Sequence, residues 1–382
     1  MINLMFKLSN FIGLGEQILI TMIITAIACA LLGCFLVLRK LSMVTDALSH
    51  SILLGIVIAY FVTKDLGSPF LIIGAGIFGV FTVYSIELVA NTGLVKNDDA
   101  VGIIFPLYFS LGVILISMFA SNVHLDTDIV LMGQTIMIPL YTTEFLGIVL
   151  PKSLLNMSII LLINVIFILL FYKELKVSTF DPQQATLSGF KSTFLFYCLM
   201  ALSSFTAVSA FDTVGAILVI SLFIAPSASA YLITKDLKYM LIVASLYATV
   251  NSIIGYYVAV ALNVSISGMV AVISGLTCFL TVLFYENGVV TSLLRLRRNR
   301  RQLKLDLVIV HIGNHLGQES EQLELGFDSI ANHLSWKQER SSKTLKRLIK
   351  ENYIVAEQVK KIFILTEKGQ ERYDLLKTQY GL

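Results

Sequence analysis

Nine apolar stretches follow one another along the first three quarters of the chain, and this succession restricts the fold more than any other feature. A helix needs about 20 apolar residues to cross a hydrocarbon layer of about 30 Å. Only 14% of the residues are charged and 56% are hydrophobic, whereas soluble domains have about 25% charged residues. The sequence therefore predicts an all-α polytopic membrane protein with nine transmembrane helices, at 17–38, 41–63, 70–92, 100–119, 153–171, 192–211, 214–233, 239–262 and 266–285.

The segment 129–150 is also apolar, but Gly133, Gln134, Pro139 and Glu144 interrupt it. Glycine and proline weaken regular helices, and an ionisable side chain is costly in lipid. We expect an interfacial or re-entrant piece at this position, not a tenth transmembrane helix.

The basic residues of the loops predict which side of the membrane each loop faces, because Lys and Arg prefer the cytoplasmic side. One threading puts all of the basic loops there: Arg39 with Lys40, Lys96, Lys173 with Lys176, Lys235 with Lys238, and Arg295 to Arg301. Under this threading the C-terminus is cytoplasmic and the N-terminus lies outside.

Two ionisable residues, Asp46 and His50, interrupt the second apolar stretch in TDALSHSILLG. If this helix begins near Leu41, a rise of about 1.5 Å per residue puts His50 about 13 Å into the membrane, with Asp46 one turn shallower. Residues four apart share a helix face, and carboxylate and imidazole ligands without a thiolate suit manganese, iron or zinc. The spacing predicts a divalent-cation site, with an internal pair that ties two helices together as the alternative.

Two further carboxylates are candidates to join this pair. Glu87 lies nine residues before Lys96, which puts it about 13 Å deep by the same rise, and its alternative role is that of a helix-packing partner. Asp212 lies between two apolar stretches beside Gly215, where the alternative is a loop or helix-cap role. The sequence leaves both alternatives open.

Five motifs together resemble the permease subunits of bacterial manganese/zinc/iron ABC importers, over about residues 15–290. In order, they are LRKLSMVTDALSHSILLGIVIAY, KNDDAVGIIFPLYFSLGVILIS, HLDTDIVLMG, FDPQQATLSGF and FDTVGAILVISLFIAPSASAYL. The resemblance implies a homodimer that binds a cytosolic ATPase dimer and receives metal from an extracellular solute-binding lipoprotein. Asp46 and His50 match the family's aspartate–histidine pair on the translocation path, whereas Asp212 in FDTVG has no matched ligand position.

The chain lacks the motif of an ATPase. A P-loop needs an adjacent Gly-Lys-Ser/Thr after a glycine-rich turn to hold phosphates, and the nearest approach, SGFKST at 188–193, has no adjacent Gly-Lys. We therefore expect a transport subunit and not an enzyme, with no permanently bound cofactor, a divalent metal as transported substrate, and ATP hydrolysis on a separate partner.

The loop STFDPQQATLSGFKS is a candidate contact for that partner. Asp181 can cap a helix that has Pro182 at its first position, and Gly189 can end it about two turns later. In the resembling family such a helix couples to the ATPase, and the alternative is an ordinary capped loop helix.

On the opposite side of the membrane, SNVHLDTDIV gathers His124, Asp126 and Asp128. Negative charge at an entrance raises the local concentration of cations, and the same surface would face a docking lipoprotein. Plain solvated loop charge is the alternative for these three residues.

From about residue 303 the composition becomes that of a soluble domain with charges of both signs. LKLDLVIVHIGNHL has helical apolar spacing, FDSIANHLSW and SSKTLKRLIKENYIV are typical of a helix–turn–helix pair, KKIFILTEKG of a strand and turn, and QERYDLLKTQY of a last helix. This order resembles a winged helix of the kind found in metal-responsive repressors. We expect a transmembrane domain at 1–294, a basic juxtamembrane linker at 295–302, and a small cytoplasmic winged-helix-like α+β domain at 303–382.

Acidic and basic residues nearly balance in 300–382, whereas nucleic-acid modules usually carry a strongly basic surface. Lys343, Lys346, Arg347 and Lys350 do line one helix. We nevertheless favour protein contact or regulation near the ATPase over nucleic-acid binding, with a structural cap as a further alternative.

The tail contains three potential metal ligands that are four residues apart, as on one face of a helix: His311, His315 and Glu319. Gly313 and Gly317 should weaken the helix that this spacing needs. The sequence therefore argues against a metal site in the tail.

These patterns predict the transmembrane subunit of an ATP-driven divalent-metal importer, with manganese ahead of zinc and iron, in a bacterial plasma membrane. One alternative is a membrane-tethered metal receptor that signals to DNA through its winged-helix tail. Another is a proton-coupled carrier, whose transport would persist without any ATPase.

Overall fold

The computed structural model describes residues 13–64, 70–119, 135–145, 148–286, 288–327, 329–330 and 338–381. Its contacts divide the chain into Met1–Tyr285, the transmembrane unit, and Glu286–Leu382, the C-terminal unit. The predicted linker at 295–302 lies inside one helix of the C-terminal unit, and the predicted domain boundaries stay a prediction.

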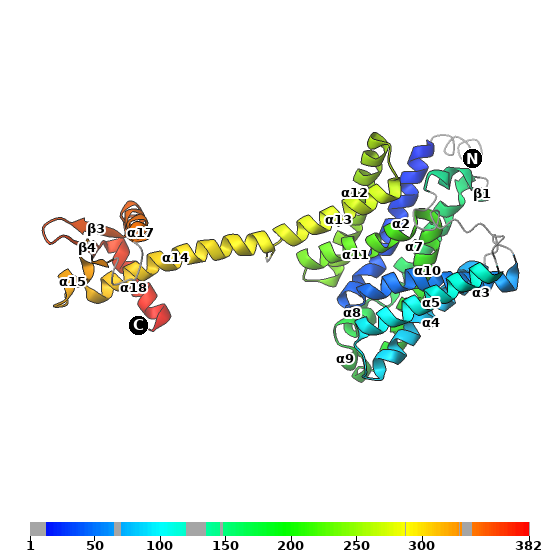
Figure 1. The fold of residues 1–382 in the computed structure, drawn as a ribbon, viewed down its shortest axis with the longest axis horizontal. Coiled ribbons are helices and arrows are strands. Elements are labelled where there is room, and N and C mark those ends of the chain that lie inside the picture. Colours follow the sequence, from blue (N-terminus) through cyan, green and yellow to red (C-terminus); the bar gives the residue numbers. More distant parts are fainter. Residues whose placement is uncertain are drawn as a thin grey trace. The chain divides into compact units, whose positions relative to one another are not determined.

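Long helices make up most of the transmembrane unit (Figure 1). Among the described residues, nine helical stretches are long and apolar enough to cross a membrane, which confirms the predicted fold class. The helices of this unit are α2 (Leu14–Leu38), α3 (Ser42–Thr63), α4 (Phe70–Asn91), α5 (Asn97–Phe119), α7 (Lys152–Leu170), α8 (Tyr172–Phe180), α9 (Pro182–Leu187), α10 (Ser192–Val214), α11 (Ala216–Ile233), α12 (Leu237–Leu262) and α13 (Ile266–Phe284).

The described part of 129–150 contains no spanning helix, as predicted. It forms the 3₁₀ helix η1 (Thr135–Leu140) and an antiparallel hairpin of β1 (Thr142–Phe145) and β2 (Ile148–Pro151). These strands were not predicted from the sequence, although β-branched Thr and Ile favour a pleated backbone. The hydroxyl groups of Thr135 and Ser267 lie 3.0 Å apart, which ties η1 to α13.

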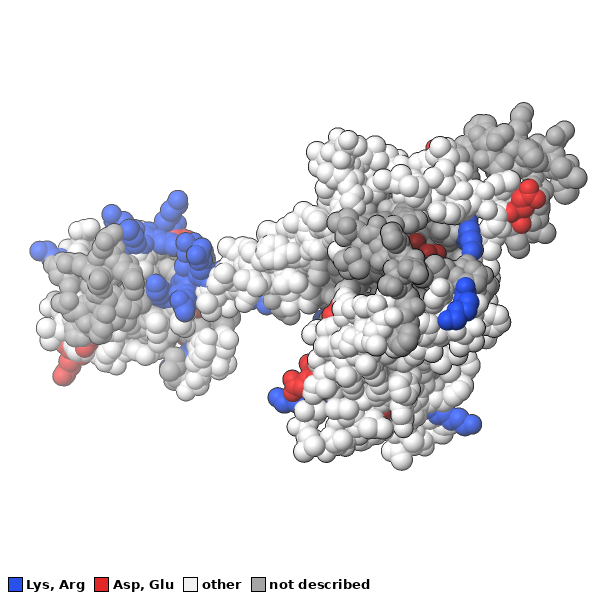
Figure 2. Space-filling view, turned by 45° about the vertical axis from the view of Figure 1, so that its right-hand side comes forward, with Lys and Arg blue, Asp and Glu red and all other residues white. Residues whose placement is uncertain are grey.

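Small residues let α2 pack closely at the centre of this unit. It contacts α7, α11 and α12, and Ala26, Ala28 and Ala30 are fully buried. At Gly33 an added Cβ would lie 2.1 Å from the backbone oxygen of Phe223. Small residues at such crossings are the usual means of close helix association in lipid. In Figure 2 most of the visible surface of this unit is uncharged, and its charged side chains form a few small groups.

Helix α3 packs against α4 and α5, and α4 packs against α10. Gly55 of α3 is required at the first of these contacts, because a Cβ there would lie 2.6 Å from the Cβ of Phe78. At the α4–α10 contact, Gly79 approaches Ser204 so closely that a Cβ would meet its hydroxyl oxygen at 1.9 Å. These close approaches hold α3, the helix that carries Asp46 and His50, against its neighbours.

Helices surround a small hairpin in the C-terminal unit (Figure 1). Strands β3 and β4 pair in antiparallel register, and a further bridge joins Gly326 to Ile362. A helix in SSKTLKRLIKENYIV, a strand in KKIFILTEKG and a last helix in QERYDLLKTQY are present as predicted, whereas a further strand at Ile354–Glu357 was not predicted. Most of FDSIANHLSW, the predicted first helix of the helix–turn–helix pair, lies outside the described residues, and the winged-helix assignment stays a prediction. The elements are α14 (Val289–His315), α15 (Glu321–Leu325), α17 (Gln338–Lys350), β3 (Ile354–Glu357), β4 (Ile362–Leu365) and α18 (Glu367–Tyr380).

Gly313 does not interrupt the helix that the spacing of His311 and His315 needs. Helix α14 runs through Gly313 and ends at His315, because the ring of Tyr373 from α18 packs where a side chain would stand. A Cβ at Gly313 would lie 2.4 Å from Cδ2 of Tyr373. Gly317, with φ of +79°, does follow the helix end, so Glu319 lies outside α14.

Candidate functional site

Asp46 and His50 lie on one face of α3, in its second and third turns. A rise of about 1.5 Å per residue puts them about 6 and 12 Å from the start of the helix. Asp46 Oδ1 is 3.5 Å from His50 Nε2. Two ligands about 2.1 Å from one tetrahedral zinc ion are about 3.4 Å apart. The two side chains are therefore spaced as ligands of a single ion, although the same distance also allows a loose ion pair.

Two phenylalanines of α5 flank the imidazole of His50. The ring centroids of Phe105 and Phe109 lie 5.6 and 5.5 Å from that of His50, the second in an edge-to-face arrangement. These rings restrict rotation of the imidazole and hold it on the side of α3 that carries Asp46. The side chains of His50 and Asp46 remain 33% and 41% exposed in the single chain, so the pair is accessible to an ion.

Asp46 and His50 are the two candidate ligand side chains that the described residues supply at this position. Among the described residues, no third His, Cys, Asp or Glu lies close enough to Asp46 and His50 to complete a group of three. Protein sites for zinc usually supply three or four ligands. If the pair binds an ion, the described residues of one chain would supply two of these ligands.

Glu87 lies four residues before the end of α4, about 6 Å along the helix axis from that end. The predicted depth assumed that the helix continues to Lys96, whereas α4 ends at Asn91. The hydroxyl of Tyr197 donates a hydrogen bond of 2.5 Å to Glu87 Oε2. Glu87 thus joins α4 to α10, and this contact supports its role as a helix-packing partner.

A cavity of about 240 Å³ lies at the ends of α3, α4, α5 and α10 that are predicted to face the cytoplasm. Glu87 and Asp98 contribute carboxylates to its wall and Lys40 contributes an ammonium group. Val44, which also lines the cavity, is two residues from Asp46. The cavity therefore lies close to the Asp46–His50 pair, near the start of α3.

Asp212 is exposed in the last turn of α10, three residues before Gly215. It does not cap α11, which begins after Gly215 without a side-chain cap. A carboxylate near the C-terminus of a helix is disfavoured by the helix dipole, by about 0.3–1 kcal/mol. The helix-cap alternative for Asp212 is therefore wrong.

The predicted capped helix before α10 is confirmed as local structure. Asp181 accepts a hydrogen bond of 2.9 Å from the backbone N–H of Gln184, Pro182 is the first residue of α9, and Gly189 follows the helix with φ of +84°. The side chains of Phe180 and Leu187 are 59% and 84% exposed. Two apolar side chains therefore lie uncovered beside a short, well-capped helix.

Arg39 forms contacts that were not predicted from the sequence, where it was a marker of the cytoplasmic side and part of the first family motif. Its guanidinium donates to the hydroxyls of Ser178, at 3.0 Å, and Thr179, at 3.3 Å. It also lies over the ring of Phe196 at 5.6 Å. Burial lowers the pKa of Arg39 to about 10. This side chain ties the turn before α3 to α8, directly ahead of α9.

The predicted outer-mouth residues His124, Asp126 and Asp128 lie outside the described residues.

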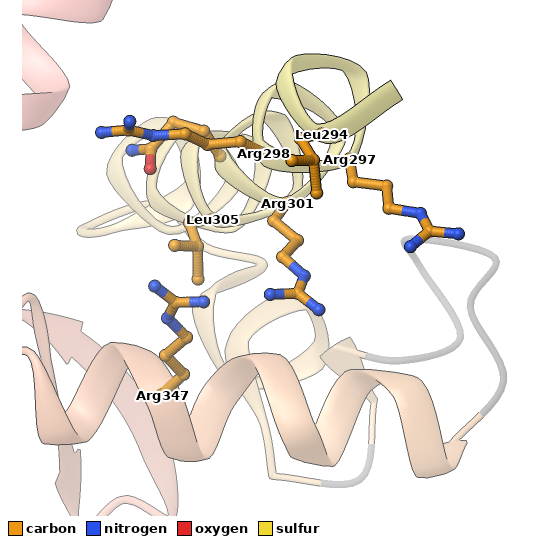
Figure 3. Close-up of a pocket in the computed structure, with 7 residues that line it drawn as sticks. Leu294, Arg297, Arg298, Arg301, Leu305 and Arg347 are labelled. Atoms are coloured by element: carbon orange, nitrogen blue, oxygen red, sulfur yellow. The ribbon is translucent and has the colours of Figure 1, made fainter. Parts of the chain in front are cut away.

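Lysine and arginine side chains gather on the face of the C-terminal unit seen in Figure 2. Arg297, Arg298 and Arg301 of α14 and Arg347 of α17 line a cavity of about 470 Å³ (Figure 3). Arg347 also forms an ion pair of 2.6 Å with Glu351. Grouped guanidinium groups favour an anionic ligand. The near balance of acidic and basic residues in 300–382 still argues against nucleic-acid binding.

Residues 14–286 match the model of the ABC 3 transport family. The chain belongs to this family. It is 41% identical over 354 residues to the zinc transport system membrane protein TroD of Treponema pallidum, which covers 92% of this chain and 96% of TroD. It is 40% identical over 281 residues to the manganese transport system membrane protein MntD of Bacillus subtilis, which covers 73% of this chain and 95% of MntD.

Among solved structures, PsaBC from Streptococcus pneumoniae in complex with Fab is similar with a TM-score of 0.60 and 26% identity. The match covers 74% of this chain and 94% of the PsaBC chain. The resemblance inferred from the motifs is thus confirmed, and the ABC 3 family member described here is a multi-pass permease of a bacterial plasma membrane. Because 354 matched residues exceed the first 286, TroD also shares part of the C-terminal unit.

Proposed function

We propose that this chain is the permease subunit of an ATP-driven importer of divalent metal ions, with manganese first and zinc or iron next. Asp46 and His50 bind the ion inside the membrane. The observation that carries the proposal is the 3.5 Å separation of their ligand atoms within a transmembrane helix. The names of the relatives MntD and TroD, which refer to manganese and zinc transport, support the substrate class.

The chemistry of the pair fits this cargo. A carboxylate oxygen and an imidazole nitrogen bind manganese, iron and zinc in many proteins, whereas copper(I) prefers thiolates and thioethers. A second copy of the chain, related by a two-fold axis, would bring another Asp46 and His50 to complete four ligands. A homodimer is therefore part of the proposal.

Carboxylates on the cytoplasmic side would assist the ion as it leaves the pair. Glu87 and Asp98 line the 240 Å³ cavity near Asp46, and negative charge raises the local concentration of cations. Glu87 and Asp212 remain secondary candidates for ligands on the path. The contact of Glu87 with Tyr197 makes it the weaker of the two as a direct ligand.

The energy source and the supply of metal lie on partners. ATP hydrolysis is proposed to occur on a cytosolic ATPase dimer, and the lack of a P-loop motif in this sequence is consistent with that division. The capped helix α9, with Asp181, Pro182 and Gly189 as its structural residues and Leu187 exposed, is the proposed contact for that ATPase. An extracellular solute-binding lipoprotein would dock on the outer side, near His124, Asp126 and Asp128.

Uptake measurements on two variants test this proposal. Asp46→Asn removes the charge and nearly keeps the shape, and His50→Ala removes the nitrogen ligand. Each should lower uptake of radioactive manganese by at least about tenfold, which corresponds to about 1.4 kcal/mol. Each should leave membrane abundance and co-purification of the ATPase unchanged, because removal of an intramembrane charge does not raise the cost of insertion.

Asp236→Asn is the matched control, because it removes the same charge from the N-cap of α12. It should keep nearly normal uptake. Near-normal uptake in both pair variants would overturn the proposed metal site. A loss of uptake that only follows the loss of protein would assign Asp46 and His50 to helix packing.

A further inference from the structure

Three metal-binding side chains meet at the end of α14. His311 and His315 are one helical turn apart, with ring centroids separated by 4.8 Å. Glu324 of α15 places Oε2 3.8 Å from His311 Nε2. One ligand atom from each of the three residues lies within 4.8 Å of the other two. Since two ligands of a tetrahedral zinc ion are about 3.4 Å apart, small rotations about the side-chain torsions bring all three to one ion.

The surroundings of this cluster are partly buried and include an unsatisfied nitrogen. The side chains of His311 and Glu324 are 14% and 21% exposed. His315 Nδ1 is buried, and among the described residues it has no hydrogen-bond partner. A buried polar atom without a partner costs about 1–3 kcal/mol. Coordination of a cation is one way in which an imidazole nitrogen recovers this cost.

Packing fixes the two elements that carry the ligands. Tyr373 of α18 packs on Gly313 and donates a hydrogen bond of 2.7 Å to Asn314 Oδ1, between the two histidines in sequence. Ile312 and Leu325 are fully buried in the core of the C-terminal unit. The ends of α14 and α15 are therefore held by contacts other than the cluster itself, which leaves the three ligands preorganised.

From this geometry we infer that the C-terminal unit binds a divalent transition-metal ion through His311, His315 and Glu324. Two imidazoles and one carboxylate are a ligand set typical of zinc sites that keep a fourth position for water. Such ligands bind zinc more tightly than manganese in the Irving–Williams order. The site lies in a different unit from Asp46 and His50, so it does not depend on the proposed transport function.

A metal-binding assay on the full chain in detergent tests the site. The parent for this assay carries Asp46→Asn and His50→Ala, so that the membrane pair contributes no metal. Equilibrium dialysis against Zn²⁺ should give one tightly bound ion per chain. His311→Ala, His315→Ala and Glu324→Gln should each weaken this binding by at least about tenfold, as expected for loss of a ligand.

Glu319→Gln is the matched control, because Glu319 completes the helical spacing in the sequence but lies beyond the end of α14. It should bind zinc as the parent does. Unchanged zinc binding in the three ligand variants would overturn the site and leave His311 and Glu324 as an ordinary contact between α14 and α15. Loss in Glu319→Gln equal to that in Glu324→Gln would overturn the assignment of Glu324.

A thiolate substitution distinguishes ligation from a folding defect. His311→Cys replaces the imidazole by another metal ligand and should produce a sulfur-to-cobalt charge-transfer band when Co²⁺ is added. Gln318→Cys, on the exposed turn after α14, should not produce this band. Absence of the band from a monodisperse His311→Cys chain would overturn the inference.

Discussion

Gly313→Ala sets two effects of known size against each other. Within an isolated helix, replacement of glycine by alanine stabilises by about 1 kcal/mol. In this protein the new Cβ would lie 2.4 to 2.7 Å from three ring atoms of Tyr373, and such overpacking costs about 1–3 kcal/mol. The clash should therefore outweigh the helix propensity, and we expect Gly313→Ala to destabilise the C-terminal unit by about 1 kcal/mol.

Thermal unfolding of the full chain measures this effect directly. Trp336 is the only tryptophan of the sequence and belongs to the C-terminal unit, so tryptophan fluorescence follows that unit alone. A change of 1 kcal/mol shifts the midpoint of a domain of 60–100 residues by about 4–8 °C. Gly313→Ala should lower the midpoint by this amount, whereas in a Tyr373→Leu background, where the ring is gone, the same substitution should raise it.

The change of sign between the two backgrounds is the decisive observation. Tyr373→Leu can lower the midpoint by itself, but the effect of Gly313→Ala is measured within each background as the difference between the chains with and without this substitution. The loss caused by Tyr373→Leu therefore cancels. If Gly313→Ala raises the midpoint while Tyr373 is present, the ring of Tyr373 does not fill the space beside Gly313. The proposed packing of α18 on the end of α14 would then be refuted.

Two other predictions concern the cytoplasmic parts of the chain. Asp181→Ala removes the N-cap hydrogen bond from the N–H of Gln184 and should destabilise α9 by about 1 kcal/mol. Co-purification of the ATPase and metal uptake should then fall together, with Thr186→Ala as the control. Unchanged co-purification in Asp181→Ala would contradict the coupling role of α9. A chain stopped after Arg301 should still insert into the membrane and keep some metal uptake, because the described core of the transmembrane unit ends at Ala271. Complete loss of uptake by a truncated chain of normal membrane abundance would contradict this prediction.

The transmembrane fold was predictable because each spanning helix satisfies its backbone hydrogen bonds within itself and needs about 20 successive apolar residues to cross the lipid. The bounds of α3 and α10 lie within a few residues of the predicted stretches. The short helix α9 was also predictable, since Asp181 and Pro182 act through their nearest neighbours. Properties that depend on a residue and its own turn of helix can be inferred from the sequence.

Features that depend on a distant partner could not be predicted in this way. The distance of Glu87 from the end of its helix could not be predicted, because the end of α4 at Asn91 has no clear stop signal. Its partner Tyr197 lies 110 residues away along the chain. Gly313 has an unfavourable helix propensity, which only the contact with Tyr373 offsets. Glu324 replaces Glu319 in the histidine cluster because α15 folds back on α14, a long-range arrangement that no local spacing encodes.

The exposed side chains beside α9 also have a consequence for the life of the protein in the cell. Phe180 and Leu187 are 59% and 84% exposed in the single chain. If the ATPase covers them on assembly, a permease made in excess of its partner presents apolar side chains that chaperones and membrane proteases bind. Unassembled copies would then be degraded faster than assembled ones, and the amounts of the two subunits would be matched after translation without any control of their genes.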